Sequence, residues 1–180
     1  MLVSFGSIAQ QSIDLSTLWQ RYAFYAVGIS GLRSMSDSEH YTAQGKGTIE
    51  KYNYLSGEKV ALLLDVNALI SEEASIPAFN SYDLSTNEQW ALIETETDQI
   101  YRRSSKSVVW VVNLQSQQAT KIRPQKISNA TFSPDGNYVA YVYDNNLYIY
   151  DISEDAHVKI TSDGSFNHII NGATDWVYEE

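Results

Sequence analysis

The chain has 180 residues, a formal net charge of −10, 43% hydrophobic residues and no cysteine. An acidic balance of this size argues against nucleic-acid binding, and the absence of cysteine excludes disulfides and thiolate metal sites. The hydrophobic content argues against a disordered polypeptide, and no run of about 18 apolar residues is present for a membrane-spanning helix. The three histidines, His40, His157 and His168, are scattered, so we expect neither a metal site nor a cofactor.

Residues 1–11 have features of the remnant of a secretory signal peptide. Leu2 to Ile8 form a short apolar run, and Ser7 and Ala9 are small residues of the kind that signal peptidase recognises, with cleavage expected after Ala9. The basic region that normally precedes the apolar run is missing, which leaves an ordinary frayed N-terminus as the alternative. The pattern favours export to the periplasm or the extracellular space.

One short helix is predicted next. Apolar residues recur there at positions i, i+3, i+4 and i+7 and would form one apolar face: Leu15, Leu18, Trp19 and Tyr22. Asp14 precedes this pattern and can cap the helix, and the glycines at 28 and 31 end it.

The rest of the chain is predicted to form short strands. The segments at 59–65, 88–95, 106–114, 137–144 and 146–152 are rich in Val, Ile, Tyr and Trp, and turn residues separate them. In the last segment Leu147, Ile149 and Asp151 alternate with residues that face the other way. Residues 144–146, Asp-Asn-Asn, predict a tight hairpin turn, because Asn and Asp tolerate positive φ.

These strands repeat as units. A strand, a polar turn and a second strand begin at Ile49, at Val108 and at Leu147. A turn followed by a strand precedes the third unit as Ser-Pro-Asp-Gly at 133–136, with looser versions at 36–38 and within 82–95. Four strands in roughly 40 to 50 residues, repeated, are typical of β-propeller blades, although a sandwich or an open sheet of hairpins would give much of the same pattern. We therefore predict an all-β fold, a partial β-propeller of about three to four four-stranded antiparallel blades with one short N-terminal helix.

The chain offers no catalytic motif. The segment GISGL at 28–32 lacks the second glycine of a nucleophile elbow and follows no strand, so Ser30 is predicted to be a loop residue. The segment GKG at 45–47 lacks the third glycine and the helix of a nucleotide-binding loop, so it is predicted to be a turn. We expect no catalytic residue in this chain.

The segment IYRRSS, residues 100–105, is expected to form a loop between two strands of the second blade. Its adjacent arginines, Arg102 and Arg103, carry planar donor groups that bind carboxylates or carbonyl oxygens. The simpler alternative is a solvated basic loop on an acidic protein.

The segment DWVYEE, residues 175–180, combines aromatic rings with two adjacent carboxylates, Glu179 and Glu180. Neighbouring carboxylates repel each other, and a bound cation such as the protonated α-amine of a peptide relieves that repulsion. A wall formed by Trp176 or Tyr178 would strengthen the contact by lowering the local dielectric constant. The simpler alternative is an acidic strand end.

Together these segments resemble the N-terminal β-propeller of the dipeptidyl peptidase IV family of serine exopeptidases. The resemblance extends from about Ile13 to Glu180 and is carried by NGATDWVYEE, FSPDGNYVAYVYDNNLYIYDI, KITSDG, GLRSMSDSEHYT and IDLSTLW. It implies an eight-bladed propeller over an α/β-hydrolase domain that carries the catalytic Ser, Asp and His. Such enzymes release dipeptides from peptide N-termini and prefer Pro or Ala at the second position.

The resemblance also matches three residues to family motifs and implies roles for two of them. In the family an arginine in the context Trp/Tyr-Arg-x-Ser holds a substrate carbonyl, and Arg102 matches it, since Tyr101 precedes it and Ser104 follows two places later. The family motif D-W-V-Y-E-E-E holds the substrate α-amine with its second and third glutamates. Glu179 matches the first glutamate and Glu180 the second, while the third is absent from this chain.

We therefore expect an incomplete N-terminal propeller domain at 12–180 of a dipeptidyl peptidase IV-like enzyme, without the hydrolase domain and not catalytic by itself. Its role would be to gate access and to bind the N-terminus of peptide substrates. The expected partners are a peptide with a free N-terminus and the hydrolase domain of the parent, which we expect to be a homodimer; nucleic acid is not expected. The alternatives are a free-standing exported β-repeat binding protein and an inactive family member that has lost its serine.

Overall fold

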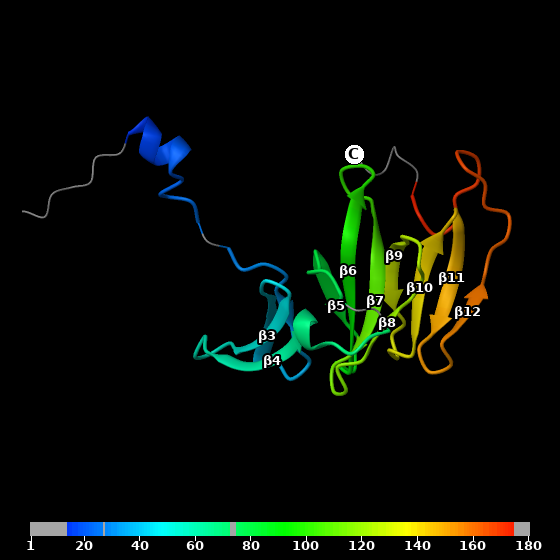
Figure 1. Ribbon diagram of the computed structural model, residues 1–180, viewed down its shortest axis with the longest axis horizontal. Helices are drawn as coiled ribbons and strands as arrows, with labels where there is room; N and C mark the ends of the chain where they lie inside the picture. The colour runs from blue at the N-terminus through cyan, green and yellow to red at the C-terminus, as the bar shows by residue number, and fades with distance from the viewer. Residues whose placement is uncertain (1–13, 27, 73–74, 175–180) are drawn as a thin grey trace, which may run out of the picture.

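The computed structural model describes residues 14–26, 28–72 and 75–174. Three four-stranded antiparallel sheets follow one another along the chain and lie side by side, as Figure 1 shows. In each sheet the strands are hydrogen-bonded in the order in which they occur in the sequence. The prediction of a partial β-propeller is confirmed, and the three sheets are three of its blades.

The first sheet contains β1 (Arg33–Ser34), β2 (His40–Gln44), β3 (Thr48–Asn53) and β4 (Lys59–Asp65). The second contains β5 (Ser81–Leu84), β6 (Trp90–Gln99), β7 (Ser105–Asn113) and β8 (Ala119–Lys121). The third contains β9 (Ser128–Phe132), β10 (Tyr138–Tyr143), β11 (Asn146–Asp151) and β12 (Ala156–Lys159). A single helical turn, η2 (Val66–Ala68), follows the first sheet.

The turn between the first two strands has the same hydrogen bond in all three blades. The backbone N–H of its fourth residue donates to the carbonyl of its first: Ser38 to Met35 at 3.3 Å, Glu88 to Ser85 at 2.8 Å and Gly136 to Ser133 at 2.9 Å. All three donor residues have positive φ, at 60°, 56° and 74°. The predicted Ser-Pro-Asp-Gly turn and its two looser versions are therefore one repeated structure.

The turn between the last two strands is repeated as well. It begins with a residue whose side-chain oxygen accepts the backbone N–H groups two and three places further on, at distances of 2.9 to 3.1 Å: Asn53, Asn113 and Asp151. The predicted tight turn between β10 and β11 is also present, with positive φ at Asp144 and Asn145. Local side-chain to backbone bonding therefore sets where each hairpin turns.

The central blade is buried on both of its faces. Along β7, Val108, Trp110 and Val112 pack with the first blade, while Val109 and Val111 pack with the third. Successive side chains of a strand point to opposite faces, so this one apolar run contributes to two separate cores. The indole Nε1 of Trp110 donates to Thr95 Oγ1 at 3.2 Å, which satisfies the polar atom of the largest buried ring.

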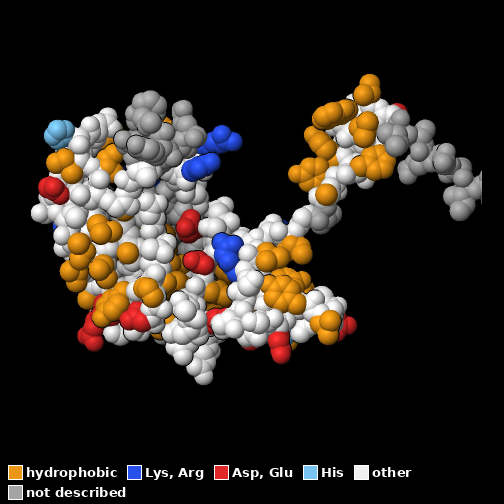
Figure 2. All heavy atoms as spheres, turned by 180° about the vertical axis from the view of Figure 1, so that it is seen from behind, with side chains coloured by type: hydrophobic (Ala, Val, Ile, Leu, Met, Phe, Trp, Pro, Cys, Tyr) orange, Lys and Arg blue, Asp and Glu red, His pale blue; other side chains and the backbone are white. Residues whose placement is uncertain are grey.

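The predicted N-terminal helix is present as η1 (Ser16–Gln20), and the carboxylate of Asp14 accepts the N–H of Thr17 at 2.6 Å. Its apolar side chains are exposed, however, by 75% at Leu15 and 70% at Trp19. Figure 2 shows this segment standing away from the sheets with its hydrophobic side chains uncovered. No helix within the described ranges has the length and apolar character needed to cross a bilayer.

Candidate functional site

The predicted loop at 100–105 joins β6 to β7 and closes on itself. The N–H groups of Ile100 and Tyr101 both donate to the carbonyl of Ser104, at 2.9 and 3.3 Å, and the amide of Gln99 donates to the carbonyl of Tyr101. Arg102 is exposed at the tip of this turn, and so is Arg103. These backbone bonds hold the loop in shape while the guanidinium groups remain open to a ligand.

An irregularity in β6 precedes the loop. The register of β6 against β7 shifts between Thr95 and Asp98, and Glu96 within the shift has φ of 51°. An extra residue of this kind bends a strand and redirects the side chains that follow it. The loop therefore extends from a bulged strand end rather than from a regular hairpin.

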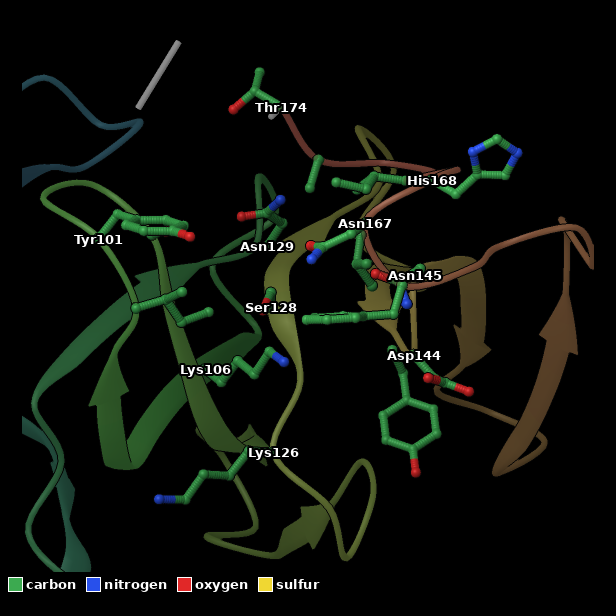
Figure 3. A pocket seen from close by; sticks show the side chains of 17 residues that line it. Tyr101, Lys106, Lys126, Ser128, Asn129, Asp144, Asn145, Asn167, His168 and Thr174 are labelled. Carbon is green, nitrogen blue, oxygen red and sulfur yellow. The ribbon is translucent and has the colours of Figure 1, made fainter. Parts of the chain in front are cut away.

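A cavity of about 1200 Å³ lies beside the loop, between the second and third blades. Figure 3 shows its lining, which includes Tyr101 on one side and Asn145 and His168 on the other. Ser104 lines it from the loop, and Ala173 and Thr174 line it from the end of the described chain. Two segments 70 residues apart in the sequence thus meet at one cavity, at the same end of the blades (Figure 1).

The segment that follows β12 is fixed to the third blade by one backbone hydrogen bond and one from a side-chain amide. The N–H of Asn171 donates to the carbonyl of Asn145 at 3.0 Å, and the amide of Asn129 donates to the carbonyl of Gly172 at 3.1 Å. Gly172 has φ of +76°, and a Cβ there would lie 2.8 Å from Cγ2 of Val142. Only glycine fits this position without a shift, so the close packing of Gly172 on the third blade depends on it.

The sequence-predicted site residues are only partly brought together. Tyr101 and Ser104, which belong to the same loop as Arg102, line the cavity, whereas Arg102 itself does not. Glu179 and Glu180 lie outside the described residues, as do residues 1–11 with the predicted signal-peptide remnant. Ser30 lies in a loop and the glycines at 45 and 47 flank the β2–β3 turn, as predicted.

Sequence reasoning missed most of the cavity wall. Four of its polar members carry amides or a hydroxyl, which suit hydrogen bonding to a peptide: Ser128, Asn129, Asn145 and Asn167. They come from β9, from the β10–β11 turn and from the segment after β12. The predicted turn at 144–146 includes Asn145, but no local pattern marks any of the four as a lining residue. The bridge between Ser107 and Ile127 joins the second blade to the third beside the loop. Within the described ranges no three His, Asp or Glu side chains are grouped as metal ligands.

Comparison with known proteins gives a consistent result. Residues 85–180 match the family model of the dipeptidyl peptidase IV (DPP IV) N-terminal region. Prolyl endopeptidase FAP from Bos taurus is 31% identical over 148 residues, and its Homo sapiens counterpart is 30% identical over 148 residues. Each of these matches covers 81% of this chain and 19% of the relative.

A solved structure is also similar. Dipeptidyl peptidase 4 from Porphyromonas gingivalis matches with a TM-score of 0.82 and 35% sequence identity, over 96% of this chain and 25% of that one. Dipeptidyl aminopeptidase A from Saccharomyces cerevisiae is 35% identical over 98 residues, which is 48% of this chain and 10% of that relative. The chain thus spans a quarter or less of the length of these proteins.

Proposed function

We propose a substrate-binding role for this chain, which belongs to the family of the dipeptidyl peptidase IV N-terminal region. In the complete protein it gates access to the active site and binds the N-terminal part of a peptide. Arg102 holds a substrate carbonyl, and Glu180, next to Glu179, binds the free α-amine. The parent releases Xaa-Pro or Xaa-Ala dipeptides and is exported.

One observation carries this proposal. The loop that bears Arg102 and the residues that lead to 175–180 line the same cavity, through Tyr101 and Ser104 on one side and Ala173 and Thr174 on the other. A carbonyl-binding arginine and an amine-binding glutamate act on one peptide only if their segments approach each other. The two motifs are far apart in the sequence, and this approach supports a shared ligand.

The bond-breaking chemistry belongs to the hydrolase domain of the parent. There a serine hydroxyl attacks the carbonyl carbon of the second residue while a histidine accepts its proton. The peptide bond after that residue breaks as the histidine gives the proton to the leaving amine, and water then hydrolyses the acyl-enzyme to release the dipeptide. The propeller would hold the substrate peptide in position relative to that serine. Holding the amine at a fixed distance from the serine selects a cut after the second residue, because a longer N-terminal part would not fit between the two anchors.

The proposal is tested by titrating the 180-residue chain with the peptide Ala-Pro-Gly-Gly-amide and with its N-acetylated form, by calorimetry. We expect the free amine to bind about tenfold more tightly, since acetylation removes the charge. Arg102→Gln is expected to weaken binding about fivefold. Arg103→Gln is the matched control, because it removes the same charge from the adjacent exposed position.

Equal binding of the two peptides, or equal effects of the two arginine substitutions, would overturn the proposed role. The chain alone is also expected not to cleave Xaa-Pro-4-nitroanilide. Turnover at a rate comparable to a complete enzyme would contradict the assignment of catalysis to another domain.

A further inference from the structure

Lys106 is an unpaired cation in the lining of the cavity. It lies in β7, two residues after the Arg102 loop closes at Ser104, and it is exposed. Figure 3 shows its side chain pointing toward the middle of the lining residues, near Ser128. Within the part of the chain that the structure describes, Lys106 has no ion pair and no side-chain hydrogen bond.

The lack of a partner is a consequence of how the neighbouring charges are arranged. Asp98 is opposite Lys106 in the β6–β7 register, but its carboxylate is 2.8 Å from Nζ of Lys126. The ammonium of Lys126 points away from the middle of the cavity in Figure 3. Asp98 is therefore already paired, and the ammonium of Lys106 has no carboxylate partner among the described residues.

The other lining groups do not neutralise this charge. The polar side chains nearest to the middle of Figure 3 are neutral, at Ser128, Asn129 and Asn145. Asp144 is the acidic residue among the described lining residues, and its carboxylate points away from Lys106 in that view. The chain has 22 acidic and 12 basic residues, whereas the described lining residues of the cavity include two lysines and one aspartate.

We infer that Lys106 binds a carboxylate of the peptide ligand, so that the cavity favours peptides with an acidic group beyond their second residue. An ammonium flanked by amide and hydroxyl donors suits a carboxylate, which accepts several hydrogen bonds at once. The cavity, at about 1200 Å³, exceeds the roughly 300–1,000 Å³ of ordinary small-ligand sites, so it has room for residues beyond a dipeptide. This inference rests on the proposed peptide-binding function.

The carboxylate has two sources, an acidic side chain or the C-terminus of a short peptide. The test titrates the full chain with Ala-Pro-Gly-Asp-Gly-amide and its Asn counterpart, and separately with Ala-Pro-Gly-Gly as the free acid and as the amide. We expect at least one acidic form to bind about fivefold more tightly than its neutral counterpart. The pair that shows the preference identifies the source.

Substitutions then assign the preference to Lys106. Lys106→Gln should abolish the preference and leave the affinity for the neutral peptide unchanged, while Lys106→Arg should keep it. Lys46→Gln is the matched control, since Lys46 is exposed in the β2–β3 turn of the first blade. A preference that persists in Lys106→Gln, or that is absent from both peptide pairs while the neutral peptides bind, overturns this inference alone. Failure of every peptide to bind overturns the proposed function.

Discussion

Thr42 and Tyr82 are 40 positions apart in the sequence, yet Thr42 Oγ1 and the Tyr82 hydroxyl are 2.7 Å apart in the interior. Thr42 lies in β2 of the first blade and Tyr82 in β5 of the second. The Tyr82 hydroxyl donates to the carbonyl of Gly31 at 2.5 Å, so it accepts its other hydrogen bond from Thr42. The two blades are thus joined by a buried chain of hydrogen bonds as well as by apolar packing.

Replacing Tyr82→Phe is expected to lower the free energy of unfolding by about 1–3 kcal/mol, because the carbonyl of Gly31 would lose its donor and the buried Thr42 hydroxyl would keep only the long contact to the carbonyl of Arg33, at 3.5 Å. Thr42→Val should cost a similar amount. The double variant should cost less than the sum, since it removes both polar groups. Urea denaturation measures all three, and Tyr101→Phe, at a half-exposed ring, is the control. Strictly additive losses would show that the two hydroxyls do not depend on each other.

His157 in β12 lies beside a hydrogen bond that joins Arg123, which follows β8, to Tyr141 in β10. The Tyr141 hydroxyl is 3.0 Å from Nδ1 of His157 and accepts a hydrogen bond from Nη1 of Arg123 at 3.1 Å. The guanidinium of Arg123 also stacks on Tyr143. Partial burial, and then the charge of Arg123, lower the pKa of His157 below its ordinary value of 6.5, while Asp155 opposes the shift.

Stability should therefore fall as the pH drops below about 6.5. In that range the unfolded chain binds a proton at His157 that the folded chain takes up less readily, so protonation favours unfolding. We expect His157→Gln to reduce the difference in urea midpoint between about pH 7.5 and about pH 5. His168→Gln, at an exposed position on the same blade, should leave it unchanged. An undiminished difference in His157→Gln would contradict the assignment.

Much of the fold could be predicted from the sequence because its turns are specified locally. Ser133 and Gly136 fix one turn by their own hydrogen bond and backbone angle, and Asp151 fixes another through its side chain. Alternation along 146–152 predicted one shared face for Tyr148, Tyr150 and Ile152, and these three side chains pack in the same core. The number and the order of the blades follow from these repeated turns and strands.

The candidate site was less predictable because it is assembled from distant segments. Arg102 was found through its sequence context, but its loop meets Thr174 only through the packing of two blades. No sequence pattern marked Lys106 as a site residue, since its lack of an ion-pair partner depends on the pairing of Lys126 with Asp98. Likewise, the spacing of Leu15 and Trp19 indicated an apolar face but not whether anything covers it.

Ser104 offers a test of the loop that bears Arg102. Its hydroxyl oxygen is buried without a hydrogen-bond partner among the described residues. Removing an unpaired buried hydroxyl relieves a desolvation cost, so Ser104→Ala should leave the free energy of unfolding unchanged or raise it by up to about 1 kcal/mol. Ser133→Ala is the contrast, because that hydroxyl is bonded to Asp135 and accepts the N–H of Tyr138 at 3.0 Å. A loss at Ser104 as large as that at Ser133 would reveal an unrecognised partner.

Gly136 tests how tightly the turns of adjacent blades are packed. It has φ of +74°, and a Cβ there would lie 3.2 Å from both Nδ2 of Asn87 and Cβ of Ser85 in the equivalent turn of the second blade. Gly57 has a similar φ of +70° but nothing within 4 Å, so it isolates the effect of the backbone angle. We expect Gly57→Ala to cost about 1–2 kcal/mol from the left-handed conformation. Gly136→Ala should cost more, because the neighbouring turn must also move. Equal losses in thermal or urea unfolding would show that the second blade yields freely at this contact.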